Sequence, residues 1–409
     1  MSDLFQKIKE NKGPLGKWAN KAEGYFVFPE LKGSISNIME FNGNKVIMWS
    51  VNDYLGLANN KEILEFDTNT IKECGIAYPM GGRMMTGETN YHTTFENELA
   101  EFMGKEKALL LNFGYQGLFS VIDALVNKND VIVYDRDSHA CIVDGVRLHI
   151  GKRFTFKNND IESLEVNLKR ATKITEKTGG GILVISEGVF GMRGEQGILK
   201  EIVALKKKYD FKFLIDDAHG FGTLGDNGNG TGFEQNCQDG IDVYFATFTK
   251  AMAGIGAFVV GDKFLIDYLK YNTRSQMYAK SLPLVMVKSG LKRLKMIKEN
   301  PQFKHKLWQI TKKLQWELKN EGFDIGKTNS CITPIFLKVS IPEAMSLVYD
   351  LRENHKIFCS IIIYPVIPKG LLLLRLIPTA SHTFVDVERS IKAFLAVRSK
   401  LESGLYLKH

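Results

Sequence analysis

The stretch ATFTKAMAGIGAFVVG, from Ala246 to Gly261, carries the pattern that decides the fold. It reads as the end of one strand (243–247), a turn that holds Lys250, a glycine-rich reversal and a second apolar strand (257–261). Burial among apolar residues lowers the pKa of a lysine, because the charged ammonium loses its hydration. A neutral amine is a nucleophile, so the stretch predicts Schiff-base chemistry at Lys250. The alternative is a solvated loop lysine, the usual state in a chain with 54 lysines and arginines.

Two further stretches place polar side chains directly after apolar strands. KFLIDDAHGFGTLG puts Asp216, Asp217 and His219 behind a strand at 213–215, and DVIVYDRDSHACI delivers His139 in the same way. The carboxyl ends of strands in an open parallel sheet are where ligands bind. A carboxylate fixed there can keep a pyridinium nitrogen protonated, which a pyridoxal ring needs in order to accept electrons.

Strands and helices alternate from about residue 108 to residue 261, which predicts an α/β fold with a largely parallel sheet of seven strands covered on both faces. The seven apolar runs are 108–112, 131–134, 153–156, 182–186, 213–215, 243–247 and 257–260. The turn after the first run, with Gly114 and Tyr115, opens a helix whose backbone N–H groups suit a phosphate.

Six motifs stand in order along the chain: NDYLGL (52–57), DRDSHACI (135–142), SEGVFGMRG (186–194), DDAHGFG (216–222), TFTK (247–250) and LLRLIPTASH (373–382). Together they resemble the α-oxoamine synthases, a family of enzymes dependent on pyridoxal 5'-phosphate (PLP) that includes serine palmitoyltransferase. The resemblance covers roughly residues 25 to 395, and an ordered set is more specific than any single motif. It implies the fold type I of PLP enzymes.

The resemblance also implies roles for the residues that match the motifs. Lys250 would form the Schiff base with PLP and move the substrate's α-proton, Asp216 would pair with the ring nitrogen, and His219 would bond the ring oxygen. His139 would stack on the ring. Thr247 would hold the phosphate, together with the N–H groups at 114 and 115.

Two matching residues are assigned to the substrate and one to the partner's cofactor. Arg375 corresponds to the arginine that meets the amino-acid carboxylate, and Asn52 is placed with it. The family carries a small hydroxyl residue that reaches the phosphate of the neighbouring subunit. This chain has Ala279 there, followed by Lys280, so Lys280 is a candidate phosphate ligand.

Three cations depart from the family pattern, namely Arg83, Arg193 and Lys280. One interpretation is surface or subunit-interface charge. The other is a site for an amino acid with an anionic side chain, because a buried guanidinium needs a partner and an oxyanion supplies one. Cysteate and serine are therefore near-equal choices of substrate, ahead of glycine and alanine.

The chain is expected to divide into an N-terminal arm and ribbon (1–50), a large PLP-binding domain (51–290) and a small C-terminal α+β domain (291–409). Residues 26–28, 36–41 and 45–49 are expected to form the ribbon, with a hairpin turn at Asn42-Gly43. The arm begins with Leu4, Phe5 and Ile8 at helical spacing beside lysines, before a break at Gly13-Pro14. That helix packs on protein or, alternatively, touches a membrane surface.

Composition narrows the class of protein. A formal net charge of +8 on 409 residues could indicate nucleic-acid binding, but the lysines are scattered rather than clustered. Five cysteines without a CxxC pair argue against disulfides and against a zinc or other metal site. Without a signal peptide or an apolar span of about 20 residues, a soluble cytoplasmic protein is expected.

The leading hypothesis is an α-oxoamine synthase that condenses a small amino acid with a long-chain acyl thioester, from CoA or a carrier protein, to a 3-keto lipid base and CO2. Alternatives are a family member that uses glycine or alanine, an aminotransferase, a non-catalytic scaffold subunit, or a PLP-binding regulator. The resemblance also implies a homodimer, with the loops 81–86 and 278–281 crossing to the partner's site.

Overall fold

The structure is a computed structural model that describes residues 3–9, 16 and 19–408. Contacts divide the chain into two compact units. The large unit is Asn52–Lys306, and the small unit combines Met1–Val51 with Leu307–His409. The N-terminal ribbon therefore belongs with the C-terminal segment, and the boundary falls after Lys306 rather than at residue 290.

A seven-stranded sheet forms the centre of the large unit, in the order β4-β10-β9-β8-β7-β5-β6. Its strands are β4 (Lys107–Leu111), β5 (Val131–Asp135), β6 (Lys152–Phe156), β7 (Ile182–Glu187), β8 (Lys212–Asp216), β9 (Val243–Thr247) and β10 (Ala257–Gly261). Strand β10 is antiparallel to both of its neighbours, and the pairs that join β9, β8, β7, β5 and β6 are parallel. All seven predicted strands are confirmed to within two residues.

These strands appear in the sequence as continuous apolar runs, rather than alternating ones, because helices cover the sheet. Every residue of β7, β9 and β10 is buried. One hydrophobic cluster joins the sheet to α5, α6 and α10, through residues such as Leu118, Ile142 and Ile266. A strand buried on both faces has no polar face to show in its sequence.

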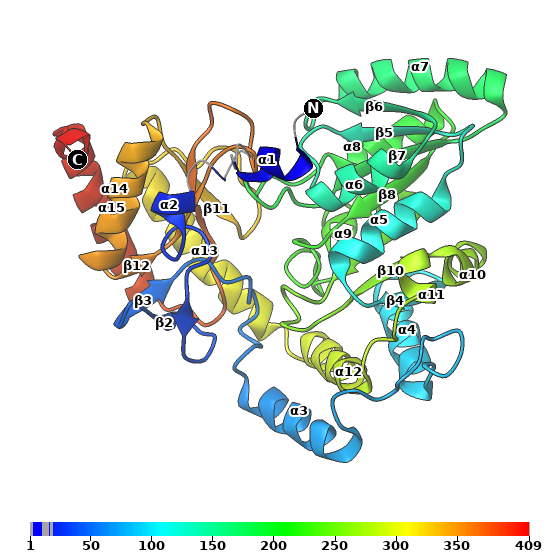
Figure 1. Cartoon of the computed structure of the whole chain (residues 1–409), viewed down its shortest axis with the longest axis horizontal. Helices are drawn as coiled ribbons and strands as arrows, with labels where there is room; N and C mark the ends of the chain where they lie inside the picture. The colour runs from blue at the N-terminus through cyan, green and yellow to red at the C-terminus, as the bar shows by residue number, and fades with distance from the viewer. Residues whose placement is uncertain (1–2, 10–15, 17–18, 409) are drawn as a thin grey trace. The chain divides into compact units, whose positions relative to one another are not determined.

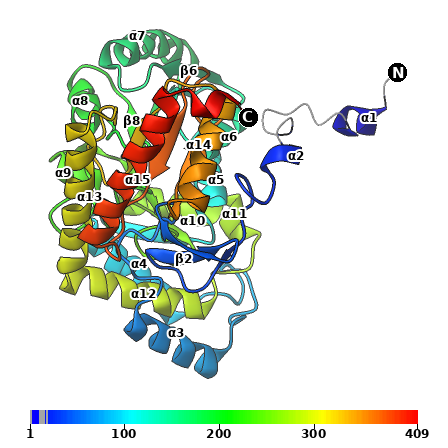
Figure 2. The same ribbon diagram turned by 90° about the vertical axis from the view of Figure 1, so that its left-hand side faces the viewer.

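Helices of the large unit follow the strands in the expected alternation. They are α3 (Lys61–Cys74), α4 (Asn90–Phe102), α5 (Gly114–Leu125), α6 (Ala140–Leu148), α7 (Ile161–Thr178), α8 (Leu199–Ala204), α9 (Thr231–Glu234), α10 (Lys263–Asn272), α11 (Arg274–Met277) and α12 (Leu284–Glu299), with 3₁₀ turns η2 (Leu205–Lys207) and η3 (Gln238–Gly240). Helix α7 lies along β5 and β6 (Figure 1). Figure 2 shows α3 against α12, at the end of this unit away from α7. Helix α13 (Gln302–Asn320) contains the boundary between the units.

The small unit has two sheets and is α+β, as predicted. One sheet has the order β1-β2-β3-β12 and the other β11-β14-β13. Its elements are α1 (Leu4–Lys9), α2 (Ala19–Ala22), β1 (Leu31–Lys32), β2 (Ile38–Phe41), β3 (Asn44–Met48), β11 (Thr333–Phe336), α14 (Ile341–Glu353), β12 (Ile357–Phe358), β13 (Ser360–Ile362), β14 (Leu373–Leu376), α15 (Phe384–Glu402) and η4 (Leu405–Lys408).

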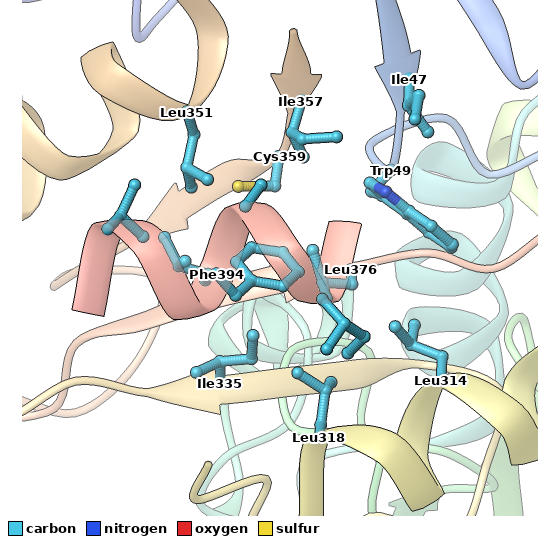
Figure 3. Close-up of a cluster of buried hydrophobic side chains, with 14 of the residues drawn as sticks. Ile47, Trp49, Leu314, Leu318, Ile335, Leu351, Ile357, Cys359, Leu376 and Phe394 are labelled. Carbon is cyan, nitrogen blue, oxygen red and sulfur yellow. The ribbon is translucent and has the colours of Figure 1, made fainter. Parts of the chain in front are cut away.

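The two ends of the sequence share one core in the small unit (Figure 3). Trp49 is fully buried, its ring stacks on His382 at 4.0 Å, and its Nε1 donates to Ser390 Oγ at 2.9 Å. Ile47 of β3 pairs in parallel register with Ile357 of β12. Residues at the start of the chain thus complete a core made mostly by its last hundred residues.

The prediction of a strand at 26–28 is wrong. Phe28 has φ 54° and an exposed fraction of 82%, which does not suit a strand. The first strand instead lies at Leu31–Lys32, where it pairs with β2. Helix α1 is present, with Leu4, Phe5 and Ile8 exposed, whereas the expected break at Gly13-Pro14 lies outside the described residues. No helix in the described part of the chain is long and apolar enough to cross a membrane.

Candidate active site

Four neighbouring strands of the large unit end in polar residues on the same edge of the sheet. Asp135, Glu187, Asp216 and Thr247 are the last residues of β5, β7, β8 and β9, and all four are buried. Glu187 and Asp216 stand side by side in the parallel register of β7 and β8. The edge predicted from DDAHGFG and DRDSHACI is therefore a real cluster of buried polar groups.

Lys250 lies in the reversal between β9 and β10. Backbone hydrogen bonds fix this loop: Phe248 N donates to Gly256 O, Gly254 N donates to Phe248 O, and both distances are 2.9 Å. The Lys250 side chain is half-buried, and its Nζ is 2.8 Å from Nε2 of His219. The amine is thus held at the carboxyl edge of the sheet beside a histidine.

His219 connects Lys250 to a buried tyrosine. Its Nδ1 is 2.7 Å from the hydroxyl of Tyr54, so Tyr54, His219 and Lys250 form one hydrogen-bonded chain. A Cβ on Gly191 would lie 2.2 Å from His219 Nε2, far inside van der Waals contact. Glycine at 191 leaves the space that this ring occupies.

The two aspartates of DDAHGFG have different surroundings. Asp217 is wholly buried and accepts hydrogen bonds from Thr231 N (2.7 Å), Thr231 Oγ1 (2.6 Å) and the Tyr244 hydroxyl (2.9 Å). Burial raises the pKa of Asp217 to about 6, against these hydrogen bonds. Asp216 instead accepts the backbone N–H of Ala218 at 3.0 Å. Asp217 stabilises the loop, whereas Asp216 lies beside Glu187 at the carboxyl edge of the sheet.

His139 caps helix α6. Its Nδ1 accepts the backbone N–H of Cys141 at 3.3 Å, and its own backbone N–H donates to Glu187. Burial, together with the charge of Lys250, lowers the pKa of His139 against the opposing influence of Asp216. Burial also raises the pKa of Glu187 well above its usual value, and the charge of Asp216 adds to this. Both influences favour the neutral form of the Glu187 carboxyl.

The start of helix α5 meets the end of β9. The N-cap residue is Phe113, whose side chain cannot accept a hydrogen bond from the first turn. A Cβ on Gly114 would lie 3.1 Å from Thr247 Oγ1, so a larger residue would crowd the space between the helix N-terminus and this hydroxyl. Tyr115 follows, with its ring edge-on to His139 at 6.1 Å and its hydroxyl bonded to Asp144. The N-terminus of α5 and the Thr247 hydroxyl, which we call the cradle, thus lie together, and they remain the predicted phosphate site.

Arg83 pairs with carboxylates of the protein, which argues against the interpretation that it meets a substrate anion. It is 6% exposed, and its Nε and Nη2 donate to Glu88 at 3.0 and 2.6 Å. Nη1 and Nη2 donate to Glu96, the latter at 3.1 Å, so four of its five N–H groups meet carboxylates. Its role is to join the loop to helix α4.

Arg193 is also paired within the protein, which argues against the same interpretation for this residue. Its Nη2 lies 3.0 Å from Asp137 Oδ2 and bonds Asn158, and its Nε lies 3.8 Å from Glu195. Lys280 is exposed, and its backbone oxygen accepts a hydrogen bond from Asn112 just before helix α5. Of the three extra cations, only Lys280 stands beside the cradle.

The two remaining predicted residues lie in different units. Asn52 opens the large unit and is half-buried, and its backbone oxygen accepts the N–H of Tyr54 at 2.9 Å. Arg375 is buried in β14 of the small unit, opposite Pro334 and Ser360 in register.

Sequence reasoning assigned no role to Tyr54, Cys141 or Glu187. Tyr54, Cys141 and Glu187 lie within the motifs NDYLGL, DRDSHACI and SEGVFGMRG, so the sequence indicates that they lie near the site. The sequence does not indicate their contact partners, since Tyr54, for example, contacts a histidine 165 positions away.

Comparison with known proteins agrees with this geometry. The family model "Aminotransferase class I and II" matches residues 44–394. The chain is 62% identical to the cysteate-C-fatty acyltransferase of Capnocytophaga ochracea, covering 99% of this chain and 97% of that protein. It is 31% identical to the serine palmitoyltransferase of Sphingobacterium spiritivorum, covering 93% and 94%.

A solved serine palmitoyltransferase of S. paucimobilis, a lysine-to-alanine variant with bound PLP–myriocin aldimine, superposes with a TM-score of 0.90 at 25% identity. The match covers 98% of this chain and 100% of that one. The fold of this chain is therefore that of fold type I PLP enzymes, as predicted. The chain belongs to the class I and II aminotransferase family and, within it, to the α-oxoamine synthases.

Proposed function

We propose that this enzyme condenses cysteate with a long-chain acyl thioester, with loss of CO2, to give a 3-keto sulfonolipid base, and that PLP is its cofactor. The observation that carries the reaction class is the Lys250 amine, 2.8 Å from His219 on the sheet edge that holds buried Asp216. The choice of amino acid is supported by the relative with 62% identity, named for cysteate and a fatty acyl group.

The residues present fit PLP. The cofactor needs an amine for its aldehyde, a carboxylate for its ring nitrogen and donors for its phosphate. Lys250 and Asp216 supply the first two. Gly114, where a Cβ would fill the space beside Thr247, leaves the N-terminus of α5 open to an anion. PLP, when bound, supplies the electron sink that stabilises negative charge at the amino acid's Cα.

Protein groups then have four tasks. Lys250 Nζ accepts the proton from the amino acid's Cα, and its contact with His219 orients it. Asp216 keeps a proton on the ring nitrogen. The α5 N–H groups and Thr247 hold the phosphate dianion, and His139 presents a ring N–H to the substrate oxygens.

The choice between cysteate and serine no longer depends on Arg83 and Arg193, because carboxylates of the protein occupy both. Lys280, beside the cradle, is the remaining cation of the three for a sulfonate. Serine is the second candidate, supported by the serine palmitoyltransferase at 31% identity.

We also propose a homodimer in the cytoplasm. The loops 81–86 and 278–281 lie together, since Ser281 N donates to Gly81 O at 3.0 Å, and they carry exposed Met84, Met85 and Tyr278. Exposed apolar side chains of this kind mark contact surfaces. The exposed Leu4, Phe5 and Ile8 of α1 support a peripheral contact with a membrane surface in the same way.

The test is a panel of cysteate, serine, glycine and alanine with one long-chain acyl-CoA and the purified protein supplied with PLP. We expect thioester consumption, CO2 release and a product of the condensed mass, fastest with cysteate, and none with the Lys250→Ala variant. Faster condensation of serine than of cysteate would overturn the proposal that cysteate is the substrate. Amino-group transfer without thioester consumption would overturn the reaction in favour of an aminotransferase.

A further inference from the structure

Cys141 stands between two residues of the site. Its Sγ lies 2.9 Å from Nδ1 of His139 and 3.8 Å from Oδ2 of Asp216. The thiol is 3% exposed. Since the backbone N–H of Cys141 donates to the same Nδ1, one residue approaches this nitrogen with both its main chain and its side chain.

A ring nitrogen that accepts hydrogen bonds cannot carry the imidazole proton. The N–H of Cys141 points at Nδ1 through the helix cap, so the neutral ring carries its proton on Nε2. Burial raises the pKa of the Cys141 thiol, so its S–H proton is retained and is also available to Nδ1 or to Asp216. A donor to Nδ1 favours the neutral ring over the charged one.

We propose that Cys141 is a positioning residue whose thiol donates to Nδ1 and so holds His139 neutral, with its proton on Nε2. The consequence for catalysis rests on the proposed function: Nε2–H of His139 then donates to a carboxylate or thioester oxygen of the substrate. The tautomer itself does not depend on that function.

Charged and titratable groups face His139 from every element packed around it. They are Asp216 of β8, Lys250 of the β9–β10 loop, Glu187 of β7, Tyr115 of α5, and Cys141 on its own helix. Of the residues that the structure describes, Cys141 alone contacts Nδ1 with its side chain, so substitution there changes the ring without altering the other charges.

The experiment compares Cys141→Ala, Cys141→Ser and, as a matched control, Cys237→Ala, a buried cysteine of the same unit outside the site. The first measurement is ¹⁵N NMR of ring-labelled histidines in the full-length protein without substrate, with the His139→Gln variant to identify the signal. The second is the pH dependence of kcat/KM with the best amino acid.

In the wild type we expect the signal of a neutral, Nε2-protonated ring. Cys141→Ala should raise the pKa of His139 by about half to one unit, which is what one neutral hydrogen bond is worth. The acid limb of kcat/KM should move up with it. Cys141→Ser, which keeps a hydroxyl donor, and Cys237→Ala should leave both unchanged.

An Nδ1-protonated ring in the wild type, or equal values in wild type and Cys141→Ala, would overturn the proposal. So would a serine variant shifted as far as the alanine variant, because the hydrogen bond would not be the cause. If no amino acid is condensed while the ring signal behaves as expected, the proposed function fails and the role of Cys141 stands.

Discussion

Replacing Lys250 by alanine removes one amine from a loop whose backbone is held by its own hydrogen bonds. We expect a folded protein whose turnover falls by about 10³-fold or more, because nucleophile and proton carrier are lost together. Condensation rates and the melting temperature check this, with Lys263→Ala, an exposed lysine of the same unit, as the control. Borohydride reduction that traps the cofactor on any other lysine would contradict the assignment.

Asp216 and Asp217 allow a matched comparison of adjacent carboxylates. Asp216→Asn should keep its stability and lose most activity, since an amide cannot hold the ring nitrogen protonated. Asp217→Asn should lose about 1–3 kcal/mol of unfolding free energy, because a buried network with Thr231 and Tyr244 is left partly unsatisfied. Denaturant titration and kcat together distinguish the structural from the catalytic aspartate. Loss of stability in Asp216→Asn with loss of activity in Asp217→Asn would mean that their roles are exchanged.

Gly191 gives a third residue-level prediction. A Cβ there collides with the ring of His219, so Gly191→Ala should displace His219 from Lys250 and lower kcat by about 10-fold or more. Stability should change little, because residue 191 is half-buried. Unchanged kcat would mean that the ring of His219 has room elsewhere.

At the scale of elements, Arg83 joins its loop to α4 by pairing with Glu88 of the loop and Glu96 of the helix. Removing one partner of a buried pair costs about 3–5 kcal/mol, so Arg83→Ala should lower the unfolding free energy by that order without changing the choice of amino acid. Arg193→Ala, at a more exposed position, should cost less. An altered preference between cysteate and serine in Arg83→Ala would show that this arginine contributes to the choice of substrate.

The same network predicts a pH dependence. Burial acts to raise the pKa of Glu88, but the hydrogen bond and charge of Arg83 hold it below its usual value. A depressed folded-state pKa contributes stability above the unfolded value, and this contribution is lost as the pH falls through the folded value. The gap in stability between wild type and Arg83→Ala should therefore narrow below about pH 4.5, the usual range of a glutamate.

Elements with a pattern of their own were predictable, and contacts between distant residues were not. The seven sheet strands show as apolar runs because both faces are covered, and α12 shows as a long periodic helix. Strands β12 and β13 are two and three residues long, too short for any period, and exist only by pairing with β3 and β14. The sequence left the role of Arg83 open for a related reason, since its partner Glu96 lies on another element.

At the scale of the whole molecule, the proposed homodimer makes a prediction about mixed subunits. If the loop 278–281 serves the partner's site, Lys250→Ala and an inactive loop variant such as Ala279→Arg should complement each other. After random mixing, about half of the dimers contain one subunit of each variant, and each such hybrid has one intact site of two. About a quarter of wild-type activity should therefore return. Light scattering checks the assembly, and a fully active monomer would refute it.

The pairing of β3 with β12 has a consequence for how the protein is made. Ser50 and Ser360, which bond each other just after these strands, are 310 positions apart, and the ribosome takes about 15 to 60 s to cover that distance at roughly 5–20 residues per second. For that time β3 pairs with β2 but lacks its second neighbour, β12, and the large unit has its complete sequence before β12 is made because it ends at Lys306. Late completion exposes the amino-terminal ribbon to chaperones and proteases. A chain released early, before residue 357, would carry an assembled PLP-binding sheet with an unfolded beginning.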